Sequence, residues 1–192
     1  SKLRRNKYKI IICPTHLTIR EISKKIKNKS IFAQHSSCTQ FGAHTGAVSL
    51  DELKNCGVDG TILNHSERKI SFKKLEKTLA ICKKKQMRTI VCASTMGEIK
   101  KIATLKPDYI AYEPKSLIGK EISVTSAKPE IIIQAIKEIK AITRKTKLLC
   151  GAGIHSKEDV GQALILGCHG VLLAHAVVQA KDPKKFLEEM LI

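Results

Sequence analysis

The sequence predicts an α/β fold built on parallel strands with helical connections. Short apolar runs rich in β-branched residues alternate with segments of helical spacing along all 192 residues. These runs are continuously apolar instead of alternating with polar residues, which is typical of parallel strands that helices cover on both faces. Two architectures fit this pattern, an open doubly wound sheet and a (β/α)8 barrel.

The first half of the chain is predicted to hold three strands and three helices. The strands cover residues 8–13, 30–34 and 60–63. The helices cover residues 17–26, a short stretch after 49, and 71–85. Residues 1–7 are predicted to be the end of a basic helix, and residues 35–47 a polar loop. Ile19, Ile22 and Ile26 have the spacing of an apolar helix face. Ser49 is expected to cap the short helix, because Glu52 stands at the distance of a capping box.

The second half repeats the alternation four times, so the whole chain shows seven strand–helix units. The strands cover residues 88–93, 108–112, 147–150 and 170–174, the helices cover 96–105, 129–143, 157–166 and 183–191, and a long loop covers 114–126. Pro129 falls in the first turn of its helix, where the missing N–H is tolerated. Gly167 directly follows the helix 157–166 and is expected to end it.

The charge of the chain is strongly basic, with 35 basic and 17 acidic side chains and a net charge of +18. A basic domain invites a nucleic-acid hypothesis. However, the lysines are scattered over most segments, and three Tyr, four Phe and no Trp provide no aromatic platform for bases. We therefore expect no specific nucleic-acid partner, and a basic surface that attracts anionic substrates.

The cysteines and the apolar segments predict the compartment. Seven cysteines form no C-x-x-C pair, which argues against a zinc site, and most of them lie in apolar context. Reduced thiols in the core are typical of a cytoplasmic protein. No stretch is long enough to span a bilayer and no signal peptide is recognised, so no membrane partner is expected.

Two polar residues stand at the ends of predicted strands. His65 follows the run 60–63 and precedes what resembles the opening of a helical turn, whose N-terminus would disfavour the protonated imidazole. Glu113 follows the strand 108–112 and precedes Pro114. Considered alone, His65 could be a structural histidine whose hydrogen bonds are satisfied, and Glu113 could be a solvated glutamate of a loop. Together they make an electrophile and base pair at the mouths of parallel strands.

The last two strands carry the signal that favours a barrel. They end in Gly151-Ala152-Gly153 and in Ala174-His175-Ala176. A (β/α)8 barrel often binds phosphate through backbone groups at these two places, and glycines let the backbone approach an anion closely. Tight turns without a ligand are the alternative interpretation. No G-x-G-x-x-G follows an early strand, so the sequence gives no support for a dinucleotide-binding sheet.

Seven stretches together resemble the triosephosphate isomerase family in its short archaeal form. They are Gly42-Ala43-His44-Thr45-Gly46, Gly57-Val58-Asp59-Gly60, Leu63-Asn64-His65-Ser66-Glu67-Arg68, Tyr112-Glu113-Pro114, Leu117-Ile118-Gly119, Leu149-Cys150-Gly151-Ala152-Gly153-Ile154 and Gly170-Val171-Leu172-Leu173-Ala174. The resemblance implies a single TIM-type (β/α)8 barrel over residues 1–192. It also implies an enzyme that interconverts dihydroxyacetone phosphate and glyceraldehyde 3-phosphate through an enediolate, in glycolysis and gluconeogenesis.

The resemblance also implies the roles of individual residues. Glu113 would be the base and His65 the electrophile. The loop 114–126, with Gly119, would be a lid over the substrate, and the substrate phosphate would lie among Gly119, Gly151, Gly153, Ala174 and His175. No metal or organic cofactor is implied. The partners would be a triose phosphate and further copies of the chain, in a dimer or a tetramer.

Three departures from the family pattern leave alternatives open. The family begins with a strand that ends in Asn-x-Lys, and we expect this first strand–helix unit to be missing here, by truncation, by a split chain or by real loss. Ala47 follows Thr45-Gly46 where the family usually has Glu or His, and His175-Ala176 replaces Ser-Gly. Ala176 is expected to strain a backbone position that glycine satisfies. The alternative function is a non-catalytic phosphate-binding barrel, and a different phosphate-substrate enzyme such as an aldolase ranks after it.

Overall fold

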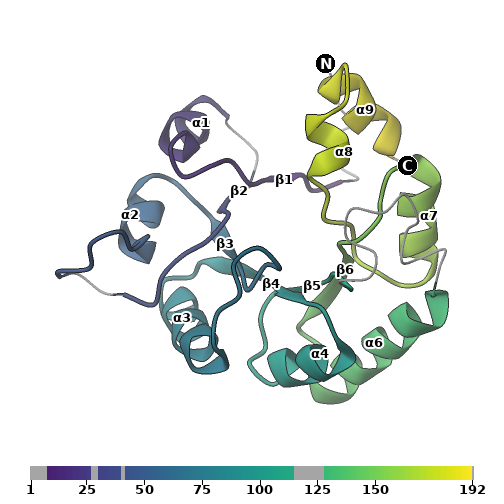
Figure 1. Cartoon of the computed structure of the whole chain (residues 1–192), viewed down its shortest axis with the longest axis horizontal. Helices are drawn as coiled ribbons and strands as arrows, with labels where there is room; N and C mark the ends of the chain where they lie inside the picture. Colours follow the sequence, from purple (N-terminus) through teal and green to yellow (C-terminus); the bar gives the residue numbers. More distant parts are fainter. Residues whose placement is uncertain (1–7, 27–29, 40–41, 115–127, 192) are drawn as a thin grey trace. The chain divides into compact units, whose positions relative to one another are not determined.

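A computed structural model describes residues 8–26, 30–39, 42–114 and 128–191 (Figure 1). The strands are β1 (Ile11–Ile12), β2 (Ser30–Ala33), β3 (Gly60–Leu63), β4 (Arg88–Ala93), β5 (Tyr109–Tyr112) and β6 (Lys147–Cys150). The helices are α1 (Ile19–Lys25), α2 (Leu50–Asn55), α3 (Phe72–Lys84), α4 (Met96–Ala103), α6 (Pro129–Ile142), α7 (Lys157–Ile165), α8 (His175–Val178) and α9 (Pro183–Met190). The chain divides into two compact units, residues 9–91 and residues 1–8 with 92–192.

The unit of residues 9–91 is built on parallel strands that are neighbours in chain order. β1 pairs with β2, β2 with β3, and β3 with the part of β4 that belongs to this unit. Ile19 of α1 and Leu50 of α2 pack with Ile31 of β2 in one buried cluster. α3 buries Leu75 and Leu79, because its apolar residues recur on one face.

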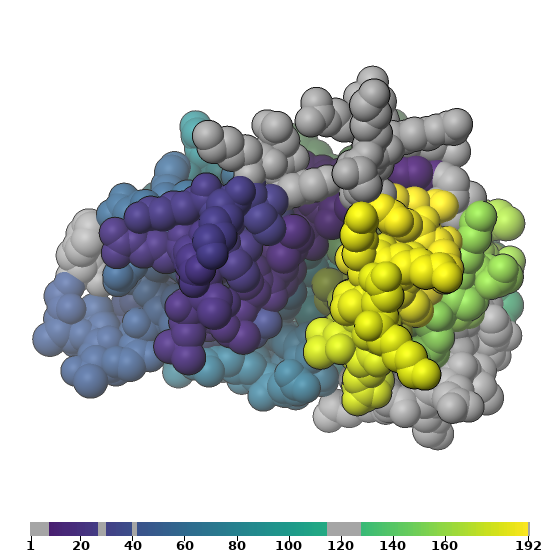
Figure 2. All heavy atoms as spheres, turned by 90° about the horizontal axis from the view of Figure 1, so that it is seen from above, coloured from purple at the N-terminus to yellow at the C-terminus, as the bar shows by residue number. Residues whose placement is uncertain are grey.

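The unit that contains residues 92–192 repeats the same logic. β5 pairs in parallel with β6, from Tyr109 opposite Lys147 to Tyr112 opposite Cys150. The backbone N–H of Glu113 donates to the carbonyl oxygen of Ala93, at the end of β4, over 2.8 Å. α4 and α6 contact each other beside these strands (Figure 1), and α9 lies against α7 (Figure 2).

The periodicity of the sequence predicts most of these elements correctly. The strands at 60–63, 88–93 and 147–150 match residue for residue. Ser49 caps α2 as expected, although its hydroxyl accepts from the N–H of Asp51 and not from that of Glu52. Pro129 lies in the first turn of α6. The α/β class with parallel strands is thereby confirmed, and the closed eight-stranded barrel and the single domain over residues 1–192 stay predictions.

Two predictions in the last part of the chain are wrong. Residues 170–174 do not form a strand, because only one bridge, between Val171 and Cys150, joins them to β6. The described residues therefore contain six named strands and not seven. His175 was expected in a turn, and it begins the short helix α8. The expectations for residues 1–7 and for the lid 114–126, apart from Pro114, lie outside the described residues.

No helix in the described part of the chain is both long and apolar enough to cross a membrane.

Candidate active site

His65 is held by the turn that follows β3. All four residues of β3 are buried. The next residue, Asn64, is buried and adopts a left-handed conformation with φ of 58°, which asparagine tolerates better than most residues. Its Oδ1 accepts from the N–H of Ile70 at 3.2 Å, and the carbonyl oxygen of His65 accepts from the N–H of Arg68 at 2.9 Å. These contacts fix the backbone on both sides of the imidazole.

The hydrogen bonds of His65 indicate which ring nitrogen carries the proton. The backbone N–H of Glu67 donates to Nδ1 at 3.3 Å. A nitrogen that accepts a hydrogen bond carries no proton, so this contact favours the tautomer of the neutral ring that has its proton on Nε2. The Glu67 carboxylate also lies 3.5 Å from Nδ1 and would favour a proton there. That side chain is 87% exposed, so water screens its charge and weakens its effect relative to that of the fixed backbone donor.

This geometry corrects one detail of the sequence prediction. We expected a helix N-terminus directly after His65. The chain instead makes a hydrogen-bonded turn, and α3 begins only at Phe72. The backbone N–H of Glu67 therefore faces the imidazole where we predicted the N-terminus of a helix.

Glu113 is buried at the end of β5, with 4% of its surface exposed. Gly151 lies directly against it. A Cβ atom built on Gly151 would lie 2.6 Å from Cγ and 3.0 Å from Oε1 of Glu113. The N–H of Gly151 also donates to the carbonyl oxygen of Tyr112 at 3.0 Å, which holds the two backbones together. The carboxylate can occupy this position only because residue 151 has no side chain.

His65 and Glu113 belong to different compact units, so their pairing in one site stays a prediction. What the structure establishes is the local placement of each. The imidazole follows β3 and the carboxylate follows β5, and these are the strand ends that the sequence predicts for them.

The predicted phosphate-binding residues have different local structures. Gly153 adopts φ of 68°, a conformation that favours glycine. Ala174 precedes the first residue of α8, and the N–H groups of Val177 and Val178 donate to its carbonyl oxygen. His175 is exposed on α8. Gly119 lies outside the described residues.

The prediction of backbone strain at Ala176 is wrong. This residue lies inside α8, and it is not among the described residues with positive φ. Because a helical backbone suits alanine, the replacement of glycine by Ala176 costs no backbone strain.

A second histidine at a strand end was not predicted. His35 follows β2 and is 8% exposed, and its carbonyl oxygen accepts from Nε2 of His16 at 2.8 Å. Burial first, and then the charges of Arg68 and His16, lower the pKa of His35 from 6.5 to about 4. We assigned residues 35–47 to a polar loop as a whole. The signal that could have found His35 is its position two residues after the buried run 31–33, close to the position that His65 takes after β3.

Comparison with known proteins decides the family. The family model described as triosephosphate isomerase matches residues 1–190. The chain is 40% identical over 183 residues to the triosephosphate isomerase of Methanothermus fervidus, a match that covers 95% of this chain and 82% of that protein. It is 39% identical over 180 residues to that of Methanocaldococcus jannaschii, covering 94% and 82%. The chain belongs to the triosephosphate isomerase family. A third relative, the triosephosphate isomerase of Methanosarcina mazei, is 37% identical over 182 residues, covering 95% of this chain and 82% of that protein.

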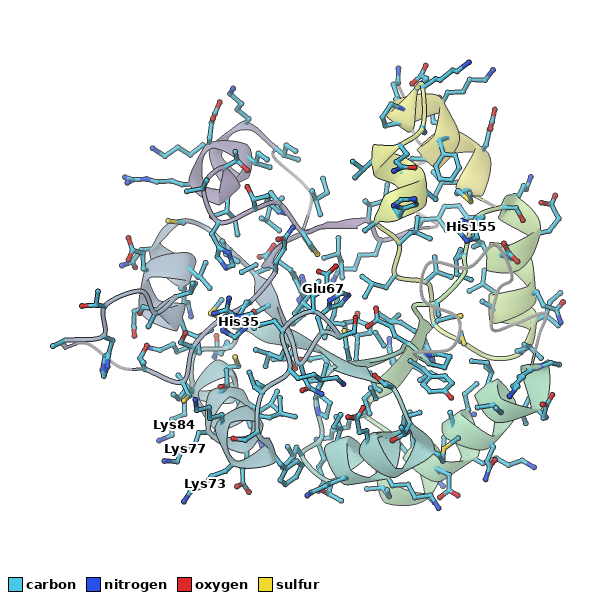
Figure 3. The ribbon with its side chains drawn as sticks, viewed as in Figure 1. His35, Glu67, Lys73, Lys77, Lys84 and His155 are labelled. Carbon is cyan, nitrogen blue, oxygen red and sulfur yellow. The ribbon has the colours of Figure 1, made fainter. Side chains whose placement is uncertain are left out.

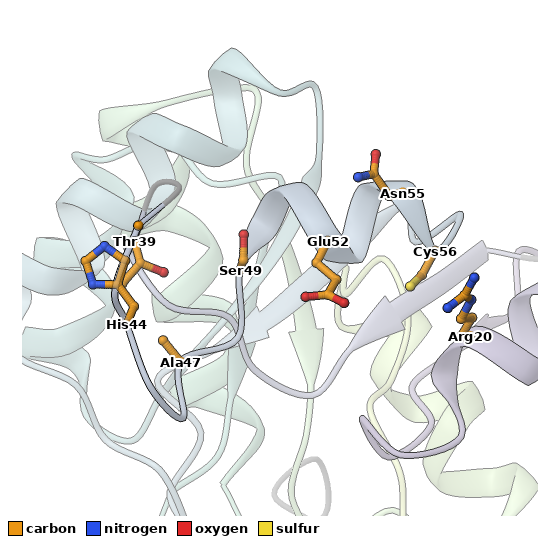
Figure 4. Close-up of a pocket in the computed structure, with 9 residues that line it drawn as sticks. Arg20, Thr39, His44, Ala47, Ser49, Glu52, Asn55 and Cys56 are labelled. Atoms are coloured by element: carbon orange, nitrogen blue, oxygen red, sulfur yellow. The ribbon is translucent and has the colours of Figure 1, made fainter.

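This member of the triosephosphate isomerase family also has a pocket that none of the residues predicted for its site lines. The pocket has a volume of about 430 Å³ and lies in the unit of residues 9–91 (Figure 4). Its lining residues are Arg20, Thr39, Gly42, His44, Ala47, Ser49, Glu52, Asn55 and Cys56. Ala47, one of the departures from the family pattern, opens onto it. None of the predicted catalytic or phosphate-binding residues is in this lining.

Proposed function

We propose that this chain interconverts dihydroxyacetone phosphate and glyceraldehyde 3-phosphate, with Glu113 as the base and His65 as the electrophile. The observation that carries the proposal is the match of residues 1–190 to the triosephosphate isomerase family, supported by relatives of that name at 37–40% identity. The reaction belongs to glycolysis and gluconeogenesis, and we infer that it takes place in the cytoplasm.

Glu113 is proposed to remove the proton from the carbon next to the substrate carbonyl. A base for this step must be held still at the edge of the substrate, because its efficiency depends on a short and well-directed proton transfer. The buried position of Glu113 against Gly151, and its backbone bond to Ala93, support that role.

His65 is proposed to polarise the carbonyl and to move a proton between the two oxygens of the enediolate. The N–H of Glu67 directed at Nδ1 supports this role, because it leaves Nε2 as the donor toward the substrate oxygen. A carboxylate base beside a neutral imidazole is the established pair of this enzyme family, and these roles are carried over from it. Nε2 first donates its proton to the carbonyl oxygen of the substrate and then takes a proton from the neighbouring hydroxyl.

The phosphate of the substrate is proposed to lie at Gly119, Gly151, Gly153, Ala174 and His175. The glycine conformation of Gly153 supports this assignment, because backbone N–H groups in such turns can face an anion. Further copies of the chain are proposed to complete the working enzyme. The side chain of Leu17 is 97% exposed, and contact with another copy would remove it from water.

A coupled assay in both directions tests the assignment. Glu113→Gln and His65→Gln keep the size of each side chain and remove its proton chemistry. Each is expected to lower kcat by about 10²- to 10⁴-fold. Glu130→Gln and His169→Gln, at exposed positions, are the matched controls and are expected to leave kcat unchanged. Thermal melting of all four variants checks the fold.

Two outcomes would contradict the proposal. Normal turnover in both Glu113→Gln and His65→Gln would remove the assigned residues. A chain that inorganic phosphate stabilises against unfolding, but that shows no turnover before any substitution, would favour the non-catalytic phosphate-binding barrel.

A further inference from the structure

The charge of α3 sets it apart from the other described helices. α3 carries five lysines and one glutamate, whereas α6 and α9 each carry two lysines and two glutamates. α7 carries one lysine, one glutamate and one aspartate. The net charge of α3 is therefore +4, from five lysines and one glutamate, and the next largest among the described helices is +2 on α1, from three basic residues and one glutamate.

Three of the α3 lysines form one row. Lys73, Lys77 and Lys84 are separated by four and seven residues, so they lie within an arc of about 40° on a helix of 3.6 residues per turn. At 1.5 Å per residue the row is about 16 Å long. Figure 3 shows the three side chains pointing to the same side, away from the ribbon. We call Lys73, Lys77 and Lys84 the lysine stripe.

The charges of the lysine stripe are not neutralised within the described part of the chain. Ion pairs there join Lys25 to Glu21, Lys85 to Asp51, Lys100 to Glu138 and Lys185 to Glu189, and none of them includes a residue of the lysine stripe. All three stripe residues are exposed. The lysine stripe therefore presents three cations to solvent in a fixed order.

The residues of the lysine stripe take no part in the packing of α3 against the core. The buried residues of α3 are Leu75, Thr78, Leu79 and Cys82, and Leu75, Leu79 and Cys82 lie on the side of the helix opposite to the lysine stripe. Because packing uses one face and the lysines occupy the other, the lysines can be replaced without opening the core.

We propose that the lysine stripe binds the phosphate backbone of a nucleic acid without reading its sequence. A straight row of ammonium groups matches a chain of phosphates, because each lysine acts as a point charge with a flexible stem. The stripe contains no aromatic residue for base stacking, and the one aromatic residue of α3, Phe72, is partly buried. A membrane surface fits less well, because no large apolar side chain of α3 is exposed for insertion. The net charge of +18 adds long-range attraction.

The test compares two triple variants of equal charge. The stripe variant is Lys73→Gln, Lys77→Gln and Lys84→Gln. The control variant is Lys24→Gln, Lys137→Gln and Lys184→Gln, which removes three exposed lysines from three other helices. Binding of the whole chain to a labelled 20-nucleotide oligo-dT is measured by fluorescence anisotropy between 50 and 200 mM KCl, and repeated with oligo-dA. Melting curves verify that both variants fold.

The expected result follows from counterion release. Loss of three phosphate contacts should reduce the slope of log K against log salt by about two, because each contact to a single strand contributes about 0.7. Relative to 1 M salt, where these contacts contribute nothing, this change corresponds to about 100-fold weaker binding at 0.1 M salt. The control variant should bind within about fivefold of the wild type, because isolated charges are screened beyond about 10 Å. Oligo-dT and oligo-dA should bind equally within about threefold.

Three results would overturn the proposal. Equal losses in the two variants would mean that only the net charge of the surface matters. Wild-type binding that does not depend on salt, or that strongly prefers one base, would remove the backbone mechanism. Stripe-dependent binding to phosphatidylserine vesicles without binding to the oligonucleotides would assign the stripe to membranes. Both variants keep Glu113 and His65, so their isomerase activity is expected to be unchanged, and failure of the proposed function would leave this test intact.

Discussion

Replacement of Gly151 by alanine should impair proton abstraction and leave phosphate binding largely intact. The new Cβ would lie 2.6 Å from Cγ and 3.2 Å from Cδ of Glu113. Carbon atoms pack at about 3.5–4.0 Å, so the carboxylate must move by about 1 Å. Misplacement of a reacting group by about 1 Å costs about 100-fold in rate. We therefore expect Gly151→Ala to lower kcat by about 100-fold.

The matched control for this substitution is Gly97→Ala. Gly97 lies in α4, and the nearest atom to its new Cβ would be Oγ1 of Thr95 at 3.9 Å, an ordinary contact. Alanine is the better helix former, so this variant should be as stable as the wild type or slightly more stable. Its kcat and KM should not change.

The assay separates two roles that Gly151 could have. If Gly151 provides space for Glu113, kcat falls while the inhibition constant of inorganic phosphate stays the same. If Gly151 only lines the phosphate site, the inhibition constant rises and kcat holds. The second pattern, or wild-type kcat in Gly151→Ala with an intact fold, would refute the reasoning from the contact between Gly151 and Glu113.

Substitutions at three further residues test the packing of a strand, a pH dependence of stability and the turn before His65. Gly60→Ala would place a Cβ 2.6 Å from Cζ of Phe32, and this overpacking should lower the free energy of unfolding by about 1–3 kcal/mol in urea titrations, whereas an unchanged midpoint would contradict the contact. The pKa of His35 lies at about 4 in the folded chain against 6.5 when unperturbed, so the unfolded chain binds the extra proton and stability falls as pH drops from 6.5 toward 4. His35→Asn should lower the slope of the free energy of unfolding against pH by up to the contribution of about one bound proton. An unchanged slope would show that other groups cause the pH dependence. Asn64→Ala should cost more stability than Asn64→Gly, because glycine adopts the φ of 58° freely; equal losses would assign the effect to the Oδ1 bond alone.

The sequence predicted the strands best where the chain is buried on both faces. The runs 60–63, 88–93 and 147–150 are buried apart from the first residue of the last two, and a polar residue or a glycine follows each of them. β1 spans only two residues although six were expected, and both of these residues are only partly buried. The run 170–174 is as apolar as the others, but strand pairing is a long-range property, and only Val171 finds a partner in β6.

Short and left-handed features escaped the sequence pattern for physical reasons. α8 has four residues, too few for a helical period to show. Asn64 was part of the recognised motif, but nothing in a single sequence indicates that its φ is positive, since asparagine occurs in many conformations. The position of His65 at the end of β3 could be predicted because it follows a buried run directly. The donor to its Nδ1 could not, because it depends on the turn between His65 and Arg68.

The two proposed catalytic side chains differ in how the fold holds them, and this difference decides where mutations act. His65 is fixed by its own neighbourhood in the sequence, through Asn64 and the N–H of Glu67. Glu113 is fixed by Gly151, which lies on the loop after another strand. Changes that reach His65 should therefore come from residues 64–70. A side chain at residue 151, in the loop after β6, should displace Glu113, since it competes with the carboxylate for the same space. Gly153 belongs to the same Gly-Ala-Gly motif, but its requirement is a φ of 68°, a conformation that asparagine tolerates. The two glycines look alike in the sequence, and only the structure separates the one that provides space from the one that provides conformation.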